Sequence, residues 1–200
     1  FDNCNITVNV PSTAPNNTVF SIVNGDNVVF KDSTLNVQFT SLYDSVNVFR
    51  GSVFYLNNTL NFKVDNCVIT TNYVISAGIV TPGNVFTLVN APICSITNSV
   101  ITGNFNKLVD ITDSNFFKLV NVGVTSTYNP NAGGTADSYN GVSYDPLNLV
   151  NSGQGYICGH VTTVLDDILI ENVIFNYAPA TNSNDRYSFI NFELTTLVSV

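Results

Sequence analysis

Methionine and tryptophan are absent from this chain of 200 residues, and charged residues make up only 10% of it. Six basic residues against 14 acidic ones give a formal net charge of −8. A nucleic-acid groove needs clustered cations to displace counterions, and an anionic membrane attracts basic segments. No apolar run approaches the roughly 20 residues of a transmembrane helix. We therefore expect no nucleic-acid partner and no membrane insertion.

Strong helix formers are few, whereas Val, Ile, Thr, Phe and Tyr are abundant. Such side chains favour pleated, half-buried strands, so the composition predicts an all-β protein. Because 31 residues are Asn, the surface is expected to be polar mainly through amides and hydroxyls. The length suffices for one domain and no stretch resembles a linker, so residues 1–200 are predicted to form a single domain.

One short pattern returns along the chain: alternating apolar residues are followed, at a fixed distance, by a polar residue. Four copies align without a gap, at residues 20–32, 54–66, 86–98 and 109–121, and a fifth copy is 187–199. The residues at the fixed polar position are Asn3, Asp32, Asn66, Asn98, Asn121, Asn172 and Ser199. A constant internal offset with variable spacing between copies is typical of a solenoid with constant turns and free loops.

Within each copy the apolar side chains alternate with polar ones, as in Phe20 and Ile22, then Val28 and Phe30. Period two places one face of each strand inward, and each copy holds about three short strands separated by polar corners. These features predict a right-handed parallel β-helix of about seven turns. Through the stacked Asn column and the apolar columns, over nearly the whole chain, the sequence resembles the pectin-lyase-like β-helix superfamily. The resemblance implies an architecture and no single function.

The Asn column has a physical explanation at a buried corner. There the backbone N–H and C=O groups lack ladder partners, and a side-chain amide donates and accepts at once. Amides stacked every ~4.8 Å also bond to one another. We therefore predict an inward Asn ladder of Asn3, Asp32, Asn66, Asn98, Asn121 and Asn172. The alternative is that these residues occupy exposed turns, where Asn and Asp tolerate unusual backbone angles.

One region departs from the pattern, because the ladder residue after Asn121 is Asn172, 51 positions later. The intervening segment contains a turn-rich stretch at residues 128–137, with Asn, Pro and Gly. Residues 147–151 resemble the opening of another copy, but no ladder residue follows at the usual distance. We therefore predict a loop insertion over about residues 129–164, and such loops often carry specific binding.

Four cysteines in an apparently extracellular chain suggest disulfides, but the repeat alignment argues otherwise. Cys4 and Cys67 fall in one column two turns apart, about 9.6 Å at one strand spacing a turn, which exceeds the reach of a disulfide. Cys94 falls on an inward apolar column, so we expect a buried free thiol that packs as a small hydrophobe. Cys158 lies outside the alignment, and its pairing with Cys94 is left open.

The best candidates for catalysis are the Asp166-Asp167 pair and the Gly159-His160 pair. They resemble the paired aspartates and the Gly-His element of polygalacturonases, in which carboxylates activate water and protonate the leaving group. Here the Gly-His pair comes first, and the Arg-x-Lys substrate clamp of that family is missing. Pectate-lyase chemistry needs clustered carboxylates and an Arg base, and the chain has only two Arg residues. We therefore predict no catalytic residues and no enzymatic activity.

No Cys or His spacing indicates a transition-metal site, and no cofactor is expected. Calcium is harder to exclude, because pairs of aspartates supply the oxygen ligands that this ion prefers. The candidate pairs are Asp110 with Asp113, Asp137 with Asp145, and Asp166 with Asp167. None of them completes a calcium-loop motif, so calcium binding is a weak alternative.

The chain starts at Phe1 without a Met or a signal sequence, so we interpret it as a processed or trimmed product. Three sequons permit N-glycosylation of a secreted protein, at Asn5, Asn16 and Asn57. Together with the low charge, they favour an extracellular location on a cell or virion surface.

Both ends of the sequence fall at one phase of the repeat, because residues 1–4 and residues 197–200 both align with residues 30–33. A solenoid that ends in this way leaves open strand edges, which are templates for another chain. We therefore predict a structural subunit of an extracellular filament or surface fibre, in which copies stack head-to-tail without closure. The predicted interface consists of Phe1, Asp2, Asn3, Leu197, Val198, Ser199 and Val200.

The competing function is a carbohydrate-binding or carbohydrate-cleaving β-helix, such as a viral tailspike, an adhesin, or a polysaccharide lyase or hydrolase. A groove along one sheet would then hold glycans against tyrosine rings. The candidate rings are those of Tyr43, Tyr55, Tyr73, Tyr128, Tyr139 and Tyr144. Most of them could equally be ordinary strand or loop residues.

Overall fold

The computed structural model describes residues 1–12, 18–41, 52–75, 84–103, 105, 107–112, 116–126, 155–161, 167–177 and 188–194. All regular secondary structure in these ranges is β-strand, which confirms the prediction of an all-β protein. No helix in the described ranges is long and apolar enough to cross a membrane.

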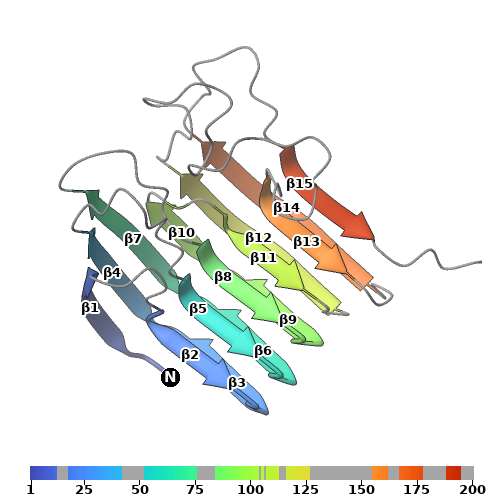
Figure 1. The fold of residues 1–200 in the computed structure, drawn as a ribbon, viewed down its shortest axis with the longest axis horizontal. Coiled ribbons are helices and arrows are strands. Elements are labelled where there is room, and N and C mark those ends of the chain that lie inside the picture. The colour runs from blue at the N-terminus through green and yellow to red at the C-terminus, as the bar shows by residue number, and fades with distance from the viewer. Residues whose placement is uncertain are drawn as a thin grey trace, which may run out of the picture.

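The strands lie side by side along the long axis of the molecule, with the N terminus at one end and β15 at the other (Figure 1). In chain order they are β1 (Asn5–Ser12), β2 (Phe20–Val23), β3 (Asn27–Lys31), β4 (Thr34–Ser41), β5 (Ser52–Asn57), β6 (Asn61–Asp65), β7 (Val68–Ile75), β8 (Asn84–Val89), β9 (Ile93–Thr97), β10 (Val100–Gly103), β11 (Val109–Thr112), β12 (Phe116–Ser126), β13 (Gly155–Val161), β14 (Asp167–Tyr177) and β15 (Ser188–Leu194).

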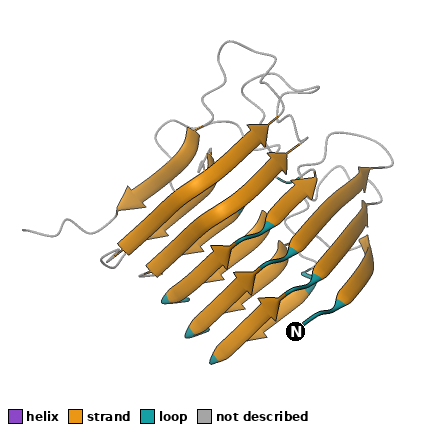
Figure 2. Ribbon diagram, turned by 180° about the vertical axis from the view of Figure 1, so that it is seen from behind, coloured by secondary structure: helices purple, strands orange, loops and turns teal. Residues whose placement is uncertain are grey.

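All strand pairs are parallel, and they form three rows. Row one is the six-stranded sheet β2-β5-β8-β11-β13-β15. Row two contains β3, β6 and β9, and row three contains β1, β4, β7 and β10. Residues 116–120 of β12 pair with row two, whereas residues 123–126 pair with row three. Because β14 pairs with β12 along both parts, the two rows form one curled nine-stranded sheet (Figure 2). From β2 onward the chain passes through rows one, two and three in order and then returns to row one.

The parallel register places equivalent residues of successive strands next to one another. Phe20, Phe54 and Phe86 are direct neighbours across β2, β5 and β8, and successive rings lie 5.1 Å apart and nearly parallel. Rows two and three contribute equivalent columns, which include Val64 and Ile69. Most buried side chains are alternate residues of their strands, so period two does mark the inward face. The exceptions are the first residues of β5 and β8, where neighbouring residues such as Val53 and Phe54 are both buried. One continuous core therefore lies between the sheets.

The register corrects the fifth copy of the repeat. Ile190 pairs with Ile157 and so occupies the position of Phe20, whereas the sequence alignment had put Tyr187 there. The fifth copy was therefore placed three residues too early, and Ser199, the polar residue predicted from it, lies outside the described residues. The alignment failed because it assumed a constant distance to a polar residue, whereas the pairing of β15 with β13 sets Ile190 opposite Ile157.

The predicted insertion is shorter than expected. Residues 155–161 fall within 129–164 but form β13, in which Ile157 pairs with Val109 of β11. The repeat search missed this strand because 15 positions separate Ile157 from Asn172, where 12 separate Val109 from Asn121. Most of the remaining interval, including residues 128–137 and 147–151, lies outside the described residues.

The three cysteines whose side chains are described are unpaired, as the repeat alignment predicted. Cys4, Cys67 and Cys94 are free, and Cys94 is 1% exposed within the core. Burial raises the pKa of the Cys94 thiol, so the neutral form is favoured. Because Cys94 is free, it is not paired with Cys158, whose side chain lies outside the described residues.

Candidate functional site

Two corners of the chain use the left-handed backbone conformation. Among the described residues, every non-glycine residue with positive φ is Asn or Asp, with φ between 47° and 55°. The first corner, between rows one and two, contains Asn24, Asn58 and Asn90. The second corner, between rows two and three, contains Asn3, Asp32, Asn66, Asn98, Asn121 and Asn172. Asn and Asp visit this region more easily than other residues with a Cβ, which explains the composition of both corners.

The predicted inward orientation of the ladder is wrong, because all six residues of the second corner are exposed. The residue that follows each of them turns inward instead, as Ser33, Cys67, Ser99 and Val122 do. Ser99 Oγ accepts from the N–H of Cys67 at 3.1 Å and donates to the carbonyl of Thr97 at 2.7 Å. A buried hydroxyl thus satisfies the corner backbone, which leaves the Asn side chain free to point outward.

The exposed amides nevertheless bond from strand to strand. At the second corner, Asn66 Nδ2 donates to Asp32 at 2.6 Å, and Asn121 Nδ2 donates to Asn98 at 3.0 Å. The first corner carries a ladder that the sequence analysis did not assign, although its residues stand at one place in the aligned copies. In that ladder Asn58 Nδ2 donates to Asn24 at 3.3 Å. Two amide ladders therefore run along the outside of the molecule.

Substitution of Asn58 separates the backbone role from the amide role. We expect Asn58→Ala to lower the free energy of unfolding by about 1–2 kcal/mol, because its left-handed φ of 51° is less favourable for alanine than for asparagine, whose short polar side chain hydrogen-bonds locally. Asn58→Gly should cost less than Asn58→Ala, because glycine adopts this conformation without a steric penalty. Urea unfolding of both variants measures the difference. Equal losses would show that the amide bonds, and not the backbone, set the requirement.

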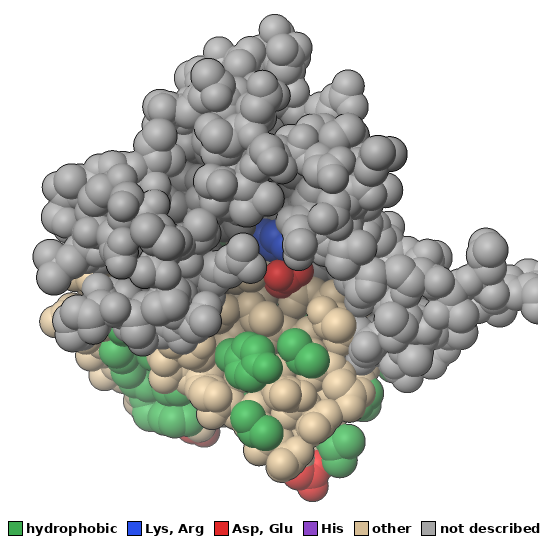
Figure 3. Space-filling view, viewed as in Figure 1, with side chains coloured by type: hydrophobic (Ala, Val, Ile, Leu, Met, Phe, Trp, Pro, Cys, Tyr) green, Lys and Arg blue, Asp and Glu red, His purple; other side chains and the backbone are tan. Residues whose placement is uncertain are grey.

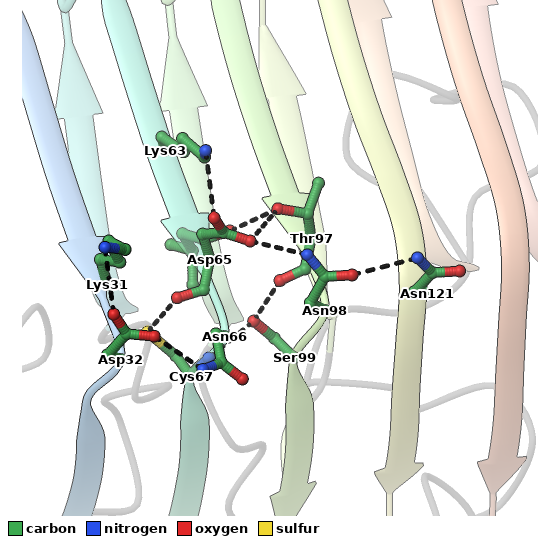
Figure 4. A network of polar contacts seen from close by, with 11 residues as sticks. Lys31, Asp32, Lys63, Asp65, Asn66, Cys67, Thr97, Asn98, Ser99 and Asn121 are labelled. Atoms are coloured by element: carbon green, nitrogen blue, oxygen red, sulfur yellow. Dashed lines mark hydrogen bonds and ion pairs between the residues drawn. The ribbon is translucent and has the colours of Figure 1, made fainter.

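Asp65 is the centre of a polar network beside the second corner (Figure 4). Its carboxylate accepts from Thr97 Oγ1 at 2.7 Å and from Asn98 Nδ2 at 2.9 Å, and it pairs with Lys63 Nζ at 3.1 Å. The hydrogen bonds from Thr97 and Asn98, with a further contribution from Lys63, lower the pKa of Asp65 to about 2. The carboxylate is therefore fully ionised at neutral pH and joins strands β6 and β9.

The Asp65 network predicts a pH-dependent contribution to stability. The pKa of the carboxyl falls from 3.8 to about 2 on folding, so ionisation favours the folded state above about pH 4 and this contribution is lost toward pH 2. We expect Asp65→Asn to cost about 1 kcal/mol at pH 7, since solvent screens the partly exposed pair. The difference between the urea midpoints of the wild-type chain and of Asp65→Asn should become smaller as the pH falls from 5 to 2.5. Asp26→Asn, at an exposed position, is the control, and a gap for Asp65→Asn that stays constant would contradict this account.

A groove of about 430 Å³ lies on the outer face of row two beside this network. It is lined by Lys63, Asp65, Ser95, Thr97, Asn98, Lys118, Val120 and Asn121. Lys63, Ser95 and Lys118 are neighbours in register, so the two lysines lie two strand spacings apart, about 10 Å. Among the described lysines, Lys118 is the one without an ion pair. The groove therefore presents hydroxyls, amides and one uncompensated positive charge.

Few of the side chains on the described surface are charged. In the face shown in Figure 3, hydrophobic side chains form small groups within uncharged polar surface, and charged side chains are few. Large exposed hydrophobic residues do occur on the outer faces, such as Phe116, which is 44% exposed, and Ile174, which is 68% exposed. The described surface is thus polar mainly through uncharged groups, as the composition predicted.

The predicted glycosylation sites lie in different surroundings. Asn5 is exposed at the start of β1, whereas Asn57 is half-buried at the end of β5. The threonine of the Asn57 sequon, Thr59, is buried and its hydroxyl donates to the carbonyl of Ile22 at 3.3 Å. Asn16 lies outside the described residues. On accessibility, Asn5 is the more suitable of the two described sites.

The candidates for catalysis or calcium binding are only partly described. Asp110 accepts from Lys107 Nζ at 3.1 Å and from Asn84 Nδ2 at 3.2 Å, so its carboxylate already has two partners. Gly159 and His160 belong to β13 and Asp167 begins β14, but no side chain of these three is described. Asp113, Asp137, Asp145 and Asp166 lie outside the described residues. Within the described part of the chain, no three His, Cys, Asp or Glu side chains gather as metal ligands.

Of the tyrosines proposed as glycan platforms, Tyr55 is described and is half-buried on the outer face of β5. Its hydroxyl accepts from Asn57 Nδ2 at 3.5 Å. Tyr73 belongs to β7 without a described side chain, and Tyr43, Tyr128, Tyr139 and Tyr144 lie outside the described residues. Tyr55 is therefore the one of these six rings that the described residues place.

Comparisons with protein-family models, with curated proteins and with solved structures find no match to this chain. Its function is therefore inferred from strand register, hydrogen bonds and exposed surface.

Proposed function

We propose that the three rows are the faces of a right-handed parallel β-helix of about seven turns, related in architecture to the pectin-lyase-like superfamily. We further propose that the protein is a structural subunit of an extracellular filament or surface fibre. In this assembly, copies stack end to end, and each copy continues the strands and the core of the next. The support comes from the repeated row order and from the strand edges at the N-terminal end.

The observation that carries this proposal is the open edge formed by β1, β2 and β3. Among the described strands, each of the three has a strand neighbour on one side only. Row three is thus open along β1, row one is open along β2, and residues 1–3 cover only part of β3. Unpaired N–H and C=O groups along a parallel edge accept a further strand in the same register.

The core is also open at this end. The ring of Phe1 stacks on Phe30 at 4.4 Å and meets the edge of Phe20 at 5.6 Å, yet Phe1 is 58% exposed. The aromatic column that continues through Phe54 and Phe86 therefore ends in a partly bare ring. Another copy that supplied an apolar side chain above Phe1 would bury this ring and continue the column.

Of the interface residues predicted from the sequence, this proposal keeps those at the N-terminal end. Phe1, Asp2 and Asn3 lie at the open edge, where the Asn3 N–H donates to the carbonyl of Lys31 at 3.1 Å. Leu197, Val198, Ser199 and Val200 lie outside the described residues, and the alignment that selected them is the one corrected above. The edge strands β1, β2 and β3 replace the terminal tetrapeptide as the basis for the proposal.

Val29 offers a direct test of edge pairing. Its carbonyl accepts from the Phe1 amine at 2.9 Å, so both polar backbone groups of Val29 face the open edge and not β6. Val29→Pro removes an edge N–H without breaking a bond to β6, and edge strands tolerate proline. Val29→Ala is the matched control, because it keeps the N–H.

We expect the wild-type chain and Val29→Ala to form filaments visible by electron microscopy as concentration rises, and to sediment as large species. Val29→Pro should remain monomeric at the same concentrations, with a circular dichroism spectrum like that of Val29→Ala. A wild-type chain that stays monomeric at high concentration would refute end-to-end assembly.

The groove beside Asp65 favours a second candidate, the binding of a carbohydrate. Its hydroxyl and amide groups match the donors and acceptors that sugar hydroxyls need, and Lys118 adds a free positive charge. A glycan array with Lys118→Ala tests this function, and Lys31→Ala serves as control because Lys31 lies outside the groove. Loss of glycan binding in Lys118→Ala, but not in Lys31→Ala, would support a binding site in the groove. If the wild-type chain binds no glycan on the array and releases no reducing sugar from polysaccharides, this function is refuted.

A further inference from the structure

A lysine, an aspartate and an asparagine form a cluster where β8 and β11 begin. Asp110 Oδ1 accepts from Lys107 Nζ at 3.1 Å, and Asp110 Oδ2 accepts from Asn84 Nδ2 at 3.2 Å. One carboxylate therefore holds an amine and a carboxamide next to each other. A lysine amine is a nucleophile toward carbonyl carbons, and a carboxylate carries protons. The cluster thus contains every group that an amide bond between the two side chains requires.

The backbone register brings the amine and the carboxamide together. Val109 pairs with Phe86, and the N–H of Val85 donates to the carbonyl of Lys107 at 2.9 Å. Continued by one residue, this register sets Lys107 beside Asn84, with their Cα atoms about 5 Å apart. The two residues are therefore direct neighbours across the strands, although 23 positions separate them in the sequence.

The side-chain amide of Asn84 has a fixed orientation. Its nitrogen also donates to Thr87 Oγ1 at 3.2 Å, and that hydroxyl bonds to Ser52 Oγ at 2.7 Å. Both N–H groups of the amide are thus used, one by the hydroxyl and one by the Asp110 carboxylate. Because the amide is already ordered, attack by the neighbouring amine costs less entropy than between free groups.

Two other lysines also share a carboxylate with an asparagine amide, but they are more exposed. Those clusters are Lys31 with Asp32 and Asn66, and Lys63 with Asp65 and Asn98. The side chain of Lys107 is 16% exposed, whereas the other two lysine side chains are 50% and 44% exposed. Hydration hinders the attack of an amine on a carbonyl carbon, so Lys107 is the best placed of the three to react.

We propose that Lys107 and Asn84 form an intramolecular isopeptide bond, and that Asp110 is the catalytic residue of this self-modification. Asp110 takes one proton from the Lys107 ammonium, and the neutral amine attacks Cγ of Asn84. A second proton then passes from Nζ to Nδ2, the Cγ–Nδ2 bond breaks, and Asp110 returns the first proton to the departing nitrogen. One ammonium ion leaves, and the Nζ–Cγ bond remains. The reaction consumes no oxidant and no second substrate.

The bond ties the start of β8 to the residue pair before β11 and closes a loop over residues 84–107. Such a cross-link stabilises a fold mainly by restricting the unfolded chain, as a disulfide does. It joins neighbouring strands of one copy, so this inference does not depend on the proposed end-to-end assembly.

Mass spectrometry of the denatured full chain tests the proposal. We expect the wild-type chain to be lighter than its sequence mass by one ammonia. Chymotrypsin, which cuts after the aromatic residues between the two positions, should release a branched peptide that joins Asn84 to Lys107. Lys107→Arg removes the nucleophile but keeps a positive charge beside Asp110, so it should have its full sequence mass. Lys31→Arg is the matched control, because it makes the same change in an exposed cluster and should keep the ammonia deficit.

Asp110→Ala tests the proton carrier, because it leaves both reacting groups in place. This variant should have its full sequence mass and a circular dichroism spectrum like that of Lys107→Arg. Loss of ammonia from Asp110→Ala as complete as from the wild-type chain would refute the role of Asp110. If this variant does not fold, the wild-type peptide map still decides whether the bond exists. A wild-type chain at full sequence mass, or an ammonia deficit that maps to another asparagine without a branched peptide, would overturn the proposal.

Discussion

Replacing Gly103 with alanine is expected to lower the free energy of unfolding by about 3 kcal/mol or more. The residue has a φ of +133°, and an added Cβ would lie 1.9 Å from the carbonyl oxygen of Thr71. That oxygen belongs to the backbone of the neighbouring strand β7, so relief requires a movement of the strand and not of a flexible side chain. Chemical denaturation should show a lower midpoint with an unchanged slope.

Gly123 supplies the control for Gly103. The two glycines lie on the adjacent strands β10 and β12 of row three, but a Cβ on Gly123 would meet nothing closer than Val100 Cγ2 at 3.9 Å. Gly123→Ala should therefore change stability by no more than about 1 kcal/mol, and in the stabilising direction if the unfolded chain loses entropy. Similar losses at both positions would mean that β7 and β10 do not approach as closely as described.

Truncation of Phe54 to alanine is the second large effect, with an expected loss of about 3–5 kcal/mol. The ring is 1% exposed and stacks between Phe20 and Phe86, both at 5.1 Å. It also meets the edges of rings from row two, including Phe30 at 4.9 Å. The substitution removes the central ring of a column and leaves a cavity that its stacked neighbours cannot close. The same denaturation experiment measures the loss.

Phe116→Ala is the matched control, because that ring is on the outer face of β12 and 44% exposed. Its loss should stay below about 1 kcal/mol. Phe54→Leu guards against complete unfolding of the alanine variant, and we expect it to cost less because leucine fills part of the space. Equal costs for Phe54→Ala and Phe116→Ala would contradict the assignment of inner and outer faces.

Both large effects arise from features that the sequence revealed to different degrees. The alternation around Phe54 and the fixed offset between copies predicted its burial and its stacking on Phe20 and Phe86. Gly103 gave no such signal, since a glycine within a strand pattern has several explanations. Its role depends on how closely β10 approaches Thr71 of β7, whose hydroxyl is buried without a partner among the described residues. Contacts between residues 32 positions apart follow from strand register, which sequence spacing alone does not specify.

The candidate site, too, was predicted from the sequence only in part. The repeat identified Asp32, Asn66, Asn98, Asn121 and Asn172 as one column, and the structure places them at one corner. Their inward orientation was wrong, because an amide suits a buried corner and an exposed left-handed turn equally well. Asp65 was not singled out at all, since its partners Thr97 and Asn98 come from the next strand of the row. A charged residue beside a ladder position looks like any other surface charge until strand register supplies its partners.

By itself, the sequence determined the strand content, the inward apolar side chains and most of the residues that share a column, because alternation and a constant offset are local properties of the chain. The tertiary structure alone decided the sign of φ at the corners, the inclusion of β13, the close approach at Gly103 and the outward orientation of the corner amides. These features depend on neighbouring strands that fix backbone angles and hydrogen-bond partners together. The hydrogen bonds between corner amides in particular exist only between strands, so no single segment of the sequence encodes them.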